Sequence, residues 1–197
     1  MSNSHSADAY NRGVEYLRGM QSLLPDPAMV EVMGNLRDRS LICTFIGENI
    51  DAVNADLRSC LIACHHCFHP QQRRPMQIFA VPLAPSFGLD GLCQLSNSAI
   101  AILVDVGRLA PKDWLRLVAH EYAHAYLNTP GHGQEFAAVL SHLCLGLGLE
   151  PPPDRINSIL RCWPPYTPTL DPLAFWRGER EFTRGYGQNQ LRNHFWR

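Results

Sequence analysis

The chain has 197 residues, of which 46% are hydrophobic and 18% charged, as expected for one globular domain with a sizeable core. Its net charge of −1 argues against a general attraction to nucleic acid or acidic membranes, and no run approaches the roughly 18 apolar residues of a transmembrane helix. The first residues lack the features of a signal peptide and seven cysteines are irregularly spaced, so we expect reduced thiols, a cytoplasmic protein and no membrane partner.

The N-terminal third is expected to be mainly helical. Residues 7–24 carry an apolar stripe at helical spacing. Asp26 followed by Pro27 is typical of a helix start and predicts a second, short helix. The run 41–46 is apolar and rich in β-branched residues, which predicts a strand. A helical stripe then recurs over residues 50–66.

The end of this last helix carries a cluster of metal-binding residue types. Cys64 and Cys67 have the spacing of a zinc knuckle, Cys60 lies one turn earlier, and His69 follows. A second cysteine pair at a conventional distance is absent. Cys60 and Cys64 also fall on the buried stripe, where a free cysteine behaves as a small hydrophobic residue. We favour a structural role for these side chains, with a second metal site as the alternative.

Three strands are predicted in the middle of the chain. Residues 76–83 and 99–106 are rich in Ile, Val and Phe, which favours strands. A shorter strand at 92–95 is predicted to pair with the strand 99–106 as a hairpin across the turn residues 96–98.

The residues that point to chemistry begin with the helix predicted over 114–127. Apolar residues recur along it at three- and four-residue spacing, and residues 128–131 (Asn-Thr-Pro-Gly) are expected to end it. His120 and His124 are one turn apart on this helix, so both imidazoles can reach one ion at about 2.0–2.1 Å. Glu121 lies beside the first histidine, in the position of a base that holds a metal-bound water.

A catalytic zinc site needs a third protein ligand and one open coordination position. His132 is our candidate, because the chain reverses after the helix and His132 stands between two glycines. A five-residue HExxH match also occurs by chance. The helical context, the helix end just after His124 and a second apolar helix after His132 favour a real site. We therefore predict one Zn²⁺ per chain, bound by His120, His124 and His132, with Glu121 as the general base.

This pattern, HExxH at 120–124 followed by Gly-His-Gly-x-Glu-Phe at 131–136, resembles the SprT-like zinc metallopeptidases and their small gluzincin-like relatives. The resemblance covers roughly residues 95–150. It implies an α+β fold, a small zincin-like domain in which an antiparallel or mixed sheet packs on the HExxH helix. It also implies that the strand before this helix borders the cleft. An extended substrate could then add to that strand or to its hairpin partner, unless both are plain core strands.

We expect a single domain, with N-terminal helices at 7–38, a core at about 40–150 and a C-terminal arm at 151–197. Residues 174–197 hold five arginines and two glutamates, a net charge of +3, interleaved with aromatic residues. One interpretation is a segment that binds nucleic acid by stacking and charge. We favour an arm that buries its aromatic side chains on the domain. The aromatic residues are Phe175, Trp176, Phe182, Tyr186, Phe195 and Trp196.

The expected function is zinc-dependent hydrolysis of peptide bonds in a protein or peptide substrate, as an endopeptidase. Tyr122, Tyr126 and Tyr166 are equal candidates for a second hydrogen-bond donor to the oxyanion. A non-catalytic zinc-binding interaction module is one alternative, disfavoured because such a module has no use for Glu121. A DNA-associated SprT-like repair protease is another. Its only support is the positively charged C-terminal arm, whereas the net charge and the lack of a cysteine-rich zinc ribbon disfavour it.

Overall fold

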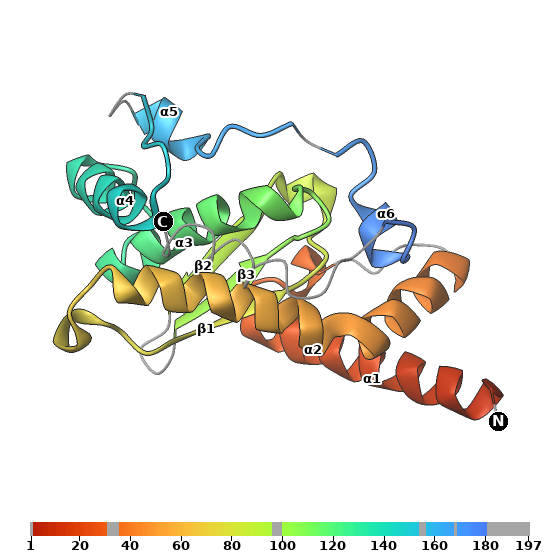
Figure 1. The fold of residues 1–197 in the computed structure, drawn as a ribbon. Coiled ribbons are helices and arrows are strands. Elements are labelled where there is room, and N and C mark those ends of the chain that lie inside the picture. Colours follow the sequence, from red (N-terminus) through yellow and green to blue (C-terminus); the bar gives the residue numbers. More distant parts are fainter. Residues whose placement is uncertain (1, 31–35, 96–99, 154–156, 168, 181–197) are drawn as a thin grey trace.

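The computed structural model describes residues 2–30, 36–95, 100–153, 157–167 and 169–180 (Figure 1). It is a mixed α+β fold in which helices surround a small three-stranded sheet. None of the helices described is long and apolar enough to cross a membrane. In chain order the helices and strands are α1 (Ser2–Leu23), α2 (Leu36–His66), β1 (Met76–Ala80), β2 (Gly91–Leu95), β3 (Ile100–Val104), α3 (Trp114–Leu127), α4 (Gln134–Leu147), α5 (Asn157–Arg161) and α6 (Leu173–Trp176).

The sheet has the order β1-β3-β2, with β3 in the centre. β3 pairs parallel with β1 and antiparallel with β2, so the predicted hairpin of β2 and β3 is confirmed. All five residues of β3 are buried, as expected for a central strand covered on both faces. β2 is an edge strand: β3 is its only strand partner in the described part of the chain. The strands are shorter than predicted, because 81–83 and 105–106 lie outside them.

The strand predicted at 41–46 is wrong, because these residues belong to the long helix α2. Ile42 and Ile46 have no exposed surface. α2 packs against α1, α3 and β1, so apolar residues are needed on several of its faces. A helix buried on several faces gives a continuous apolar run that a short strand would also give. The short helix predicted after Asp26 is a single 3₁₀ turn, Pro27–Met29, and residues 31–35 of that prediction lie outside the described residues.

α1 and α2 cross with their backbones in contact. A Cβ atom added at Gly47 would collide with the carbonyl oxygen of Ala9, and one at Gly13 would collide with that of Cys43. On each helix the two residues are four apart, so each pair shares one face. Small residues at these positions therefore let the two helix axes approach closely.

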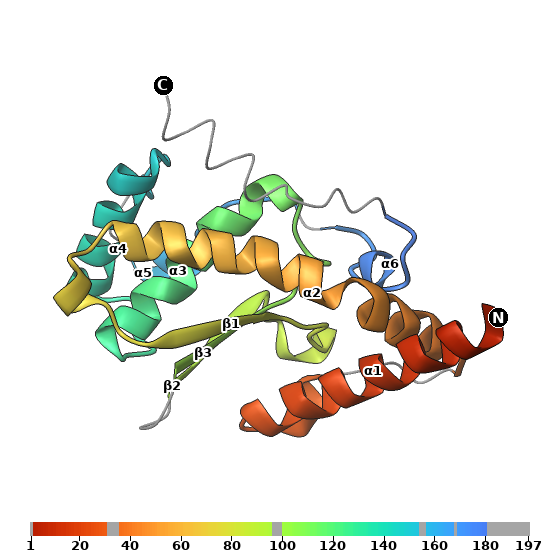
Figure 2. The same cartoon turned by 60° about the horizontal axis from the view of Figure 1, so that its bottom comes forward.

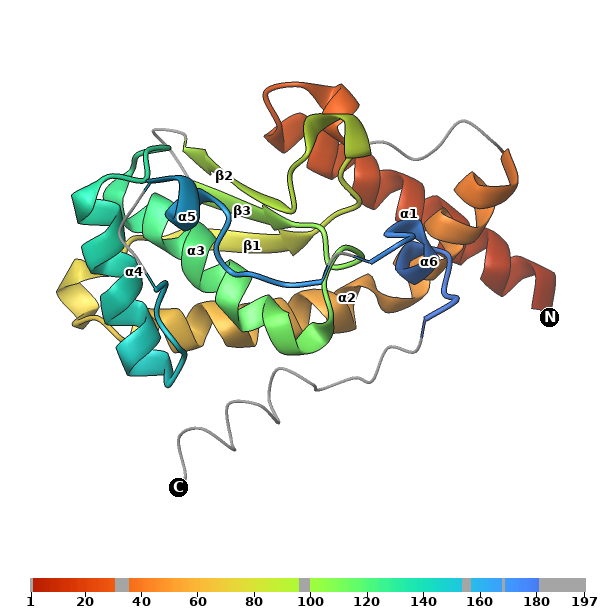
Figure 3. The same ribbon diagram turned by 90° about the horizontal axis from the view of Figure 1, so that it is seen from above.

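α2 and α3 cover one face of the sheet, α2 beside β1 and α3 beside β2 and β3 (Figure 2). α4 packs against α3, and the segment between α5 and α6 passes alongside α3 (Figure 3). α6 carries Phe175 and Trp176, which are 4% and 0% exposed. These two aromatic residues of the C-terminal arm are thus buried on the domain, and Phe182, Tyr186, Phe195 and Trp196 lie outside the described residues.

Candidate metal centre

α3 presents the two histidines of the HExxH motif toward the polypeptide that follows it. The helix ends at Asn128, which adopts a left-handed conformation with φ 56° and ψ 43°. Asparagine tolerates this conformation better than most residues, and its N–H bonds to the carbonyl of His124. The chain then reverses within a few residues, as predicted, and brings His132 back to the helix.

The Nε2 atoms of His120, His124 and His132 form a nearly equilateral triangle with sides of 3.2, 3.1 and 3.2 Å. Two nitrogens bound to one tetrahedral zinc ion at 2.0–2.1 Å lie about 3.3 Å apart. The three side chains are the one group of histidine, cysteine and acidic residues in the described chain that is close enough to hold a metal ion. The triangle fits the ligand set of one small divalent cation, and leaves a fourth position for other ligands.

The orientation of the imidazoles is fixed by their neighbours. Nδ1 of His124 lies 2.9 Å from the carbonyl oxygen of Thr129, to which it donates, so its Nε2 is left as the acceptor. Phe136, in the first turn of α4, packs on all three rings with centroid distances of 5.0, 4.5 and 4.7 Å. α4 therefore braces the three histidines.

The electrostatic surroundings keep these imidazoles neutral. Burial, and then repulsion from His124, lower the pKa of His120 to about 3 and that of His132 to about 4. Burial also lowers the pKa of His124. Nδ1 of His120 is buried without a hydrogen-bond partner in good geometry among the described residues. The backbone of Trp163 lies nearby and opposes part of the decrease in the pKa of His120. Neutral imidazole is the form that binds metals, so the site is ready for an ion at neutral pH.

Glu121 lies between α3 and the edge strand β2. Its side chain is 6% exposed, and burial followed by the charge of Asp90 raises its pKa to about 8 in the metal-free protein. A Cβ atom added at Gly91 would lie 3.2 Å from both Cγ and Oε1 of Glu121. Glycine at this position of β2 therefore makes room for the carboxylate.

The histidines and Glu121 open into a cleft of about 640 Å³. The cleft is lined by β2 with the loop before it and by the end of α5 with the chain after it, including Trp163 and Tyr166. The sequence points to Tyr166 as one of three tyrosine candidates. It does not single out Asp90, Gly91 or Trp163 as site residues. Local sequence patterns do not single out Asp90 and Gly91, because Arg108 and Glu121, which lie against them, come later in the chain.

The structure separates the three tyrosine candidates. Tyr122 is fully buried, and its hydroxyl lies 3.0 Å from Nδ1 of His65. Tyr122 and Tyr126 both stack on Phe68, on the side of α3 turned toward α2. Only Tyr166 among the three lines the cleft. His142 also lies away from the cleft, with Nε2 2.7 Å from the carbonyl oxygen of Cys67.

The cysteine cluster at the end of α2 does not form a second metal site in the described residues. Cys60 and Cys64 are 3% and 0% exposed and belong to the hydrophobic core. The Cys67 thiol donates to the carbonyl of Ala63, and His69 begins a 3₁₀ turn. Cys60 and Cys64 therefore contribute to core packing.

Comparison with known proteins gives no relative: no family model, no curated protein and no solved structure matches this chain. Function is therefore argued from the residues of the site.

Proposed function

We propose that the protein is a zinc-dependent peptidase of the zincin type, with a SprT-like active site. The observation that carries the proposal is the triangle of Nε2 atoms, spaced for a tetrahedral ion, with a buried carboxylate next to it at the bottom of a cleft. Structural zinc sites fill all four positions with protein ligands, whereas this site offers three and leaves the fourth facing the cleft. Glu121, next to His120, can serve as the general base that hydrolysis requires, whereas a binding module has no use for such a base.

His120, His124 and His132 would hold the zinc ion. Bound zinc supplies a Lewis acid that polarises the scissile carbonyl and lowers the pKa of a water molecule to about 7. Glu121 accepts a proton from the attacking water and returns it to the leaving nitrogen as the peptide bond breaks. Because a cation beside a carboxylate lowers its pKa, a bound zinc ion would oppose the effect of burial and favour the ionised form of Glu121.

The shape of the cleft supports an extended peptide as the substrate. β2 lines the cleft and, among the described residues, has β3 as its one strand partner, so its second edge can receive the backbone of a bound peptide. β3 itself is central and cannot pair further. Of the two strands that the family resemblance suggests for this role, β2 is thus the one we propose.

The test is Glu121→Gln, which keeps the shape of the side chain and removes the base. The zinc-loaded variant should hydrolyse unfolded casein at least about 10²-fold more slowly than the wild type, with unchanged zinc content. Glu48→Gln, on the exposed side of α2, is the matched control and should keep full activity. If the zinc-loaded wild type cleaves no protein in a broad panel, or if Glu121→Gln cleaves as well as the wild type, the proposal is refuted.

A further inference from the structure

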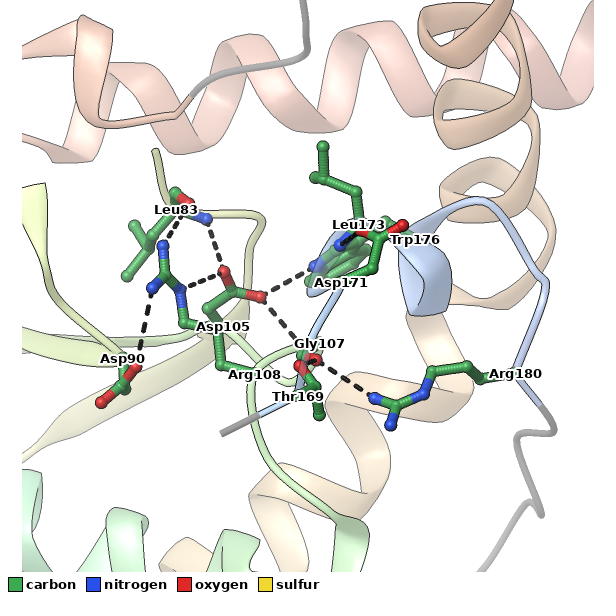
Figure 4. Close-up of polar contacts among 10 residues, drawn as sticks. All are labelled: Leu83, Asp90, Asp105, Gly107, Arg108, Thr169, Asp171, Leu173, Trp176 and Arg180. Carbon is green, nitrogen blue, oxygen red and sulfur yellow. Dashed lines mark hydrogen bonds and ion pairs between the residues drawn. The ribbon is translucent and has the colours of Figure 1, made fainter. Parts of the chain in front are cut away.

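Asp105, just after β3, is a buried carboxylate at which four N–H groups converge (Figure 4). Its side chain is 1% exposed. It accepts hydrogen bonds from the backbone of Leu83 at 3.1 Å and Gly107 at 3.1 Å, from Nε of Arg108 at 3.0 Å and from the indole Nε1 of Trp176 at 2.8 Å. The first three donors come from the domain core, and the fourth comes from the C-terminal segment. Asp105 therefore fastens that segment to the sheet.

Further contacts hold the same segment to the loop after β3. The Thr169 hydroxyl donates to the carbonyl of Gly107 at 2.8 Å, and the Thr169 N–H donates to that of Arg108 at 3.3 Å. A Cβ atom added at Gly107 would collide with the carbonyl oxygen of Pro172 and lie 2.9 Å from the Trp176 indole nitrogen. The segment thus follows the loop closely from residue 169 to α6.

The same network continues toward the cleft through Arg108. Its Nη2 donates to the carbonyl of Leu83 at 3.1 Å, and its Nη1 lies 3.8 Å from the carboxylate of Asp90. The backbone carbonyl of Asp90 accepts from the N–H of Asp105 at 2.7 Å. Tyr166, on the C-terminal segment, lies close to Asp90, and burial and then this carboxylate raise its pKa. Asp90 and Tyr166 both line the cleft.

We propose that Trp176 and Asp105 are positioning residues: their hydrogen bond anchors the C-terminal segment, residues 163–167 and 169–176, beside the cleft and so places the Tyr166 hydroxyl to donate a hydrogen bond to the bound peptide. The inference rests on the proposed function. Tyr166 is carried by the anchored segment and lies beside Asp90, whose own position depends on Arg108 and Asp105. In the metal-free protein the Asp90 carboxylate accepts from the Tyr166 hydroxyl, and the single O–H turns to the substrate when a peptide binds. Losing the indole donor loosens this arrangement and leaves the three histidines and Glu121 unsubstituted.

The first test measures the anchor in the metal-free, full-length protein. Trp176→Phe keeps an aromatic ring and removes the N–H that donates to the Asp105 carboxylate. Loss of a hydrogen bond to a charged acceptor should increase the equilibrium constant for local opening of the segment by about tenfold or more. The Thr169 amide should exchange with solvent deuterium faster by that factor. Met20→Ala, in α1, is a control for general destabilisation. When it and the wild type are each measured the same number of degrees below their own melting temperatures, the exchange rate of the Thr169 amide should be the same. Equal Thr169 exchange in Trp176→Phe and the wild type overturns the anchor.

The second test is a double-mutant cycle in the zinc-loaded protein. Tyr166→Phe should lower kcat by about 10–100-fold with unchanged zinc content, and Trp176→Phe should lower kcat less. The double variant should be no slower than Tyr166→Phe, because the anchor acts through this hydroxyl. If the decrease in kcat of the double variant equals the product of the decreases in the two single variants, the coupling between Trp176 and Tyr166 is overturned. If the wild type hydrolyses nothing, the proposed function and the role of Tyr166 toward substrate both fail, whereas the exchange measurement still decides whether Trp176 holds the segment.

Discussion

Gly47→Ala should destabilise the protein although alanine is the better helix former. In an isolated helix this substitution would stabilise by up to about 1 kcal/mol. Here the new Cβ would lie 2.9 Å from the Ala9 Cα atom and still closer to its carbonyl oxygen. Because backbone cannot relax by a rotamer change, α1 must retreat by about 1 Å in a close-packed interior. Such overpacking typically costs about 1–3 kcal/mol, and the upper end applies to a backbone contact, so we expect a net loss of about 2 kcal/mol.

Gly19→Ala is the matched control, because Gly19 also lies within a helix and a Cβ there would meet nothing within 4 Å. It should stabilise by up to about 1 kcal/mol. The two variants then differ by about 3 kcal/mol, which for a protein of this size separates their melting temperatures by about 6–12 °C. Thermal melts and urea denaturation of both variants measure this difference. If Gly47→Ala melts at or above the wild type, the close backbone crossing of α1 and α2 is refuted.

Three further predictions concern the site and the C-terminal arm. His132→Ala should bind zinc at least about tenfold more weakly by competition with a chelator, because one of three ligands is lost; unchanged affinity would remove His132 from the site. Gly91→Ala should keep zinc but lower kcat by about tenfold, because the new Cβ would lie 3.2 Å from Glu121 and displace its carboxylate. An unchanged kcat would show that the exact position of Glu121 does not limit catalysis. Deleting residues 174–197 should lower the free energy of unfolding by several kcal/mol, because Phe175 and Trp176 are buried, and deleting only 181–197 should lower it less. Equal denaturation curves for the two truncations would contradict the packing of these two aromatic side chains on the domain.

The sequence predicts the local features of the site well, because they depend on neighbours in the chain. The spacing of His120 and His124, the helix end after them and the return of His132 all follow from residues within about one helix length. Asp105 and Asp90 escape such reasoning, because their partners Trp176 and Tyr166 lie more than 70 residues away in the chain. The strand predicted at 41–46 fails for a related reason: only the packing of α2 between several elements explains its apolar residues on every side.

The histidine triangle has a consequence for how a metal ion would reach this site. The three imidazoles are held by Thr129, by Phe136 and by burial, all of which belong to the polypeptide itself. An ion would then enter a site whose shape the polypeptide already sets, unlike in zinc fingers, where the ion completes the fold. A preformed set of nitrogen ligands binds first-row cations in the order of their intrinsic affinities, in which copper(II) ranks above zinc. Which ion such a site would take then depends on the metals available when it is filled.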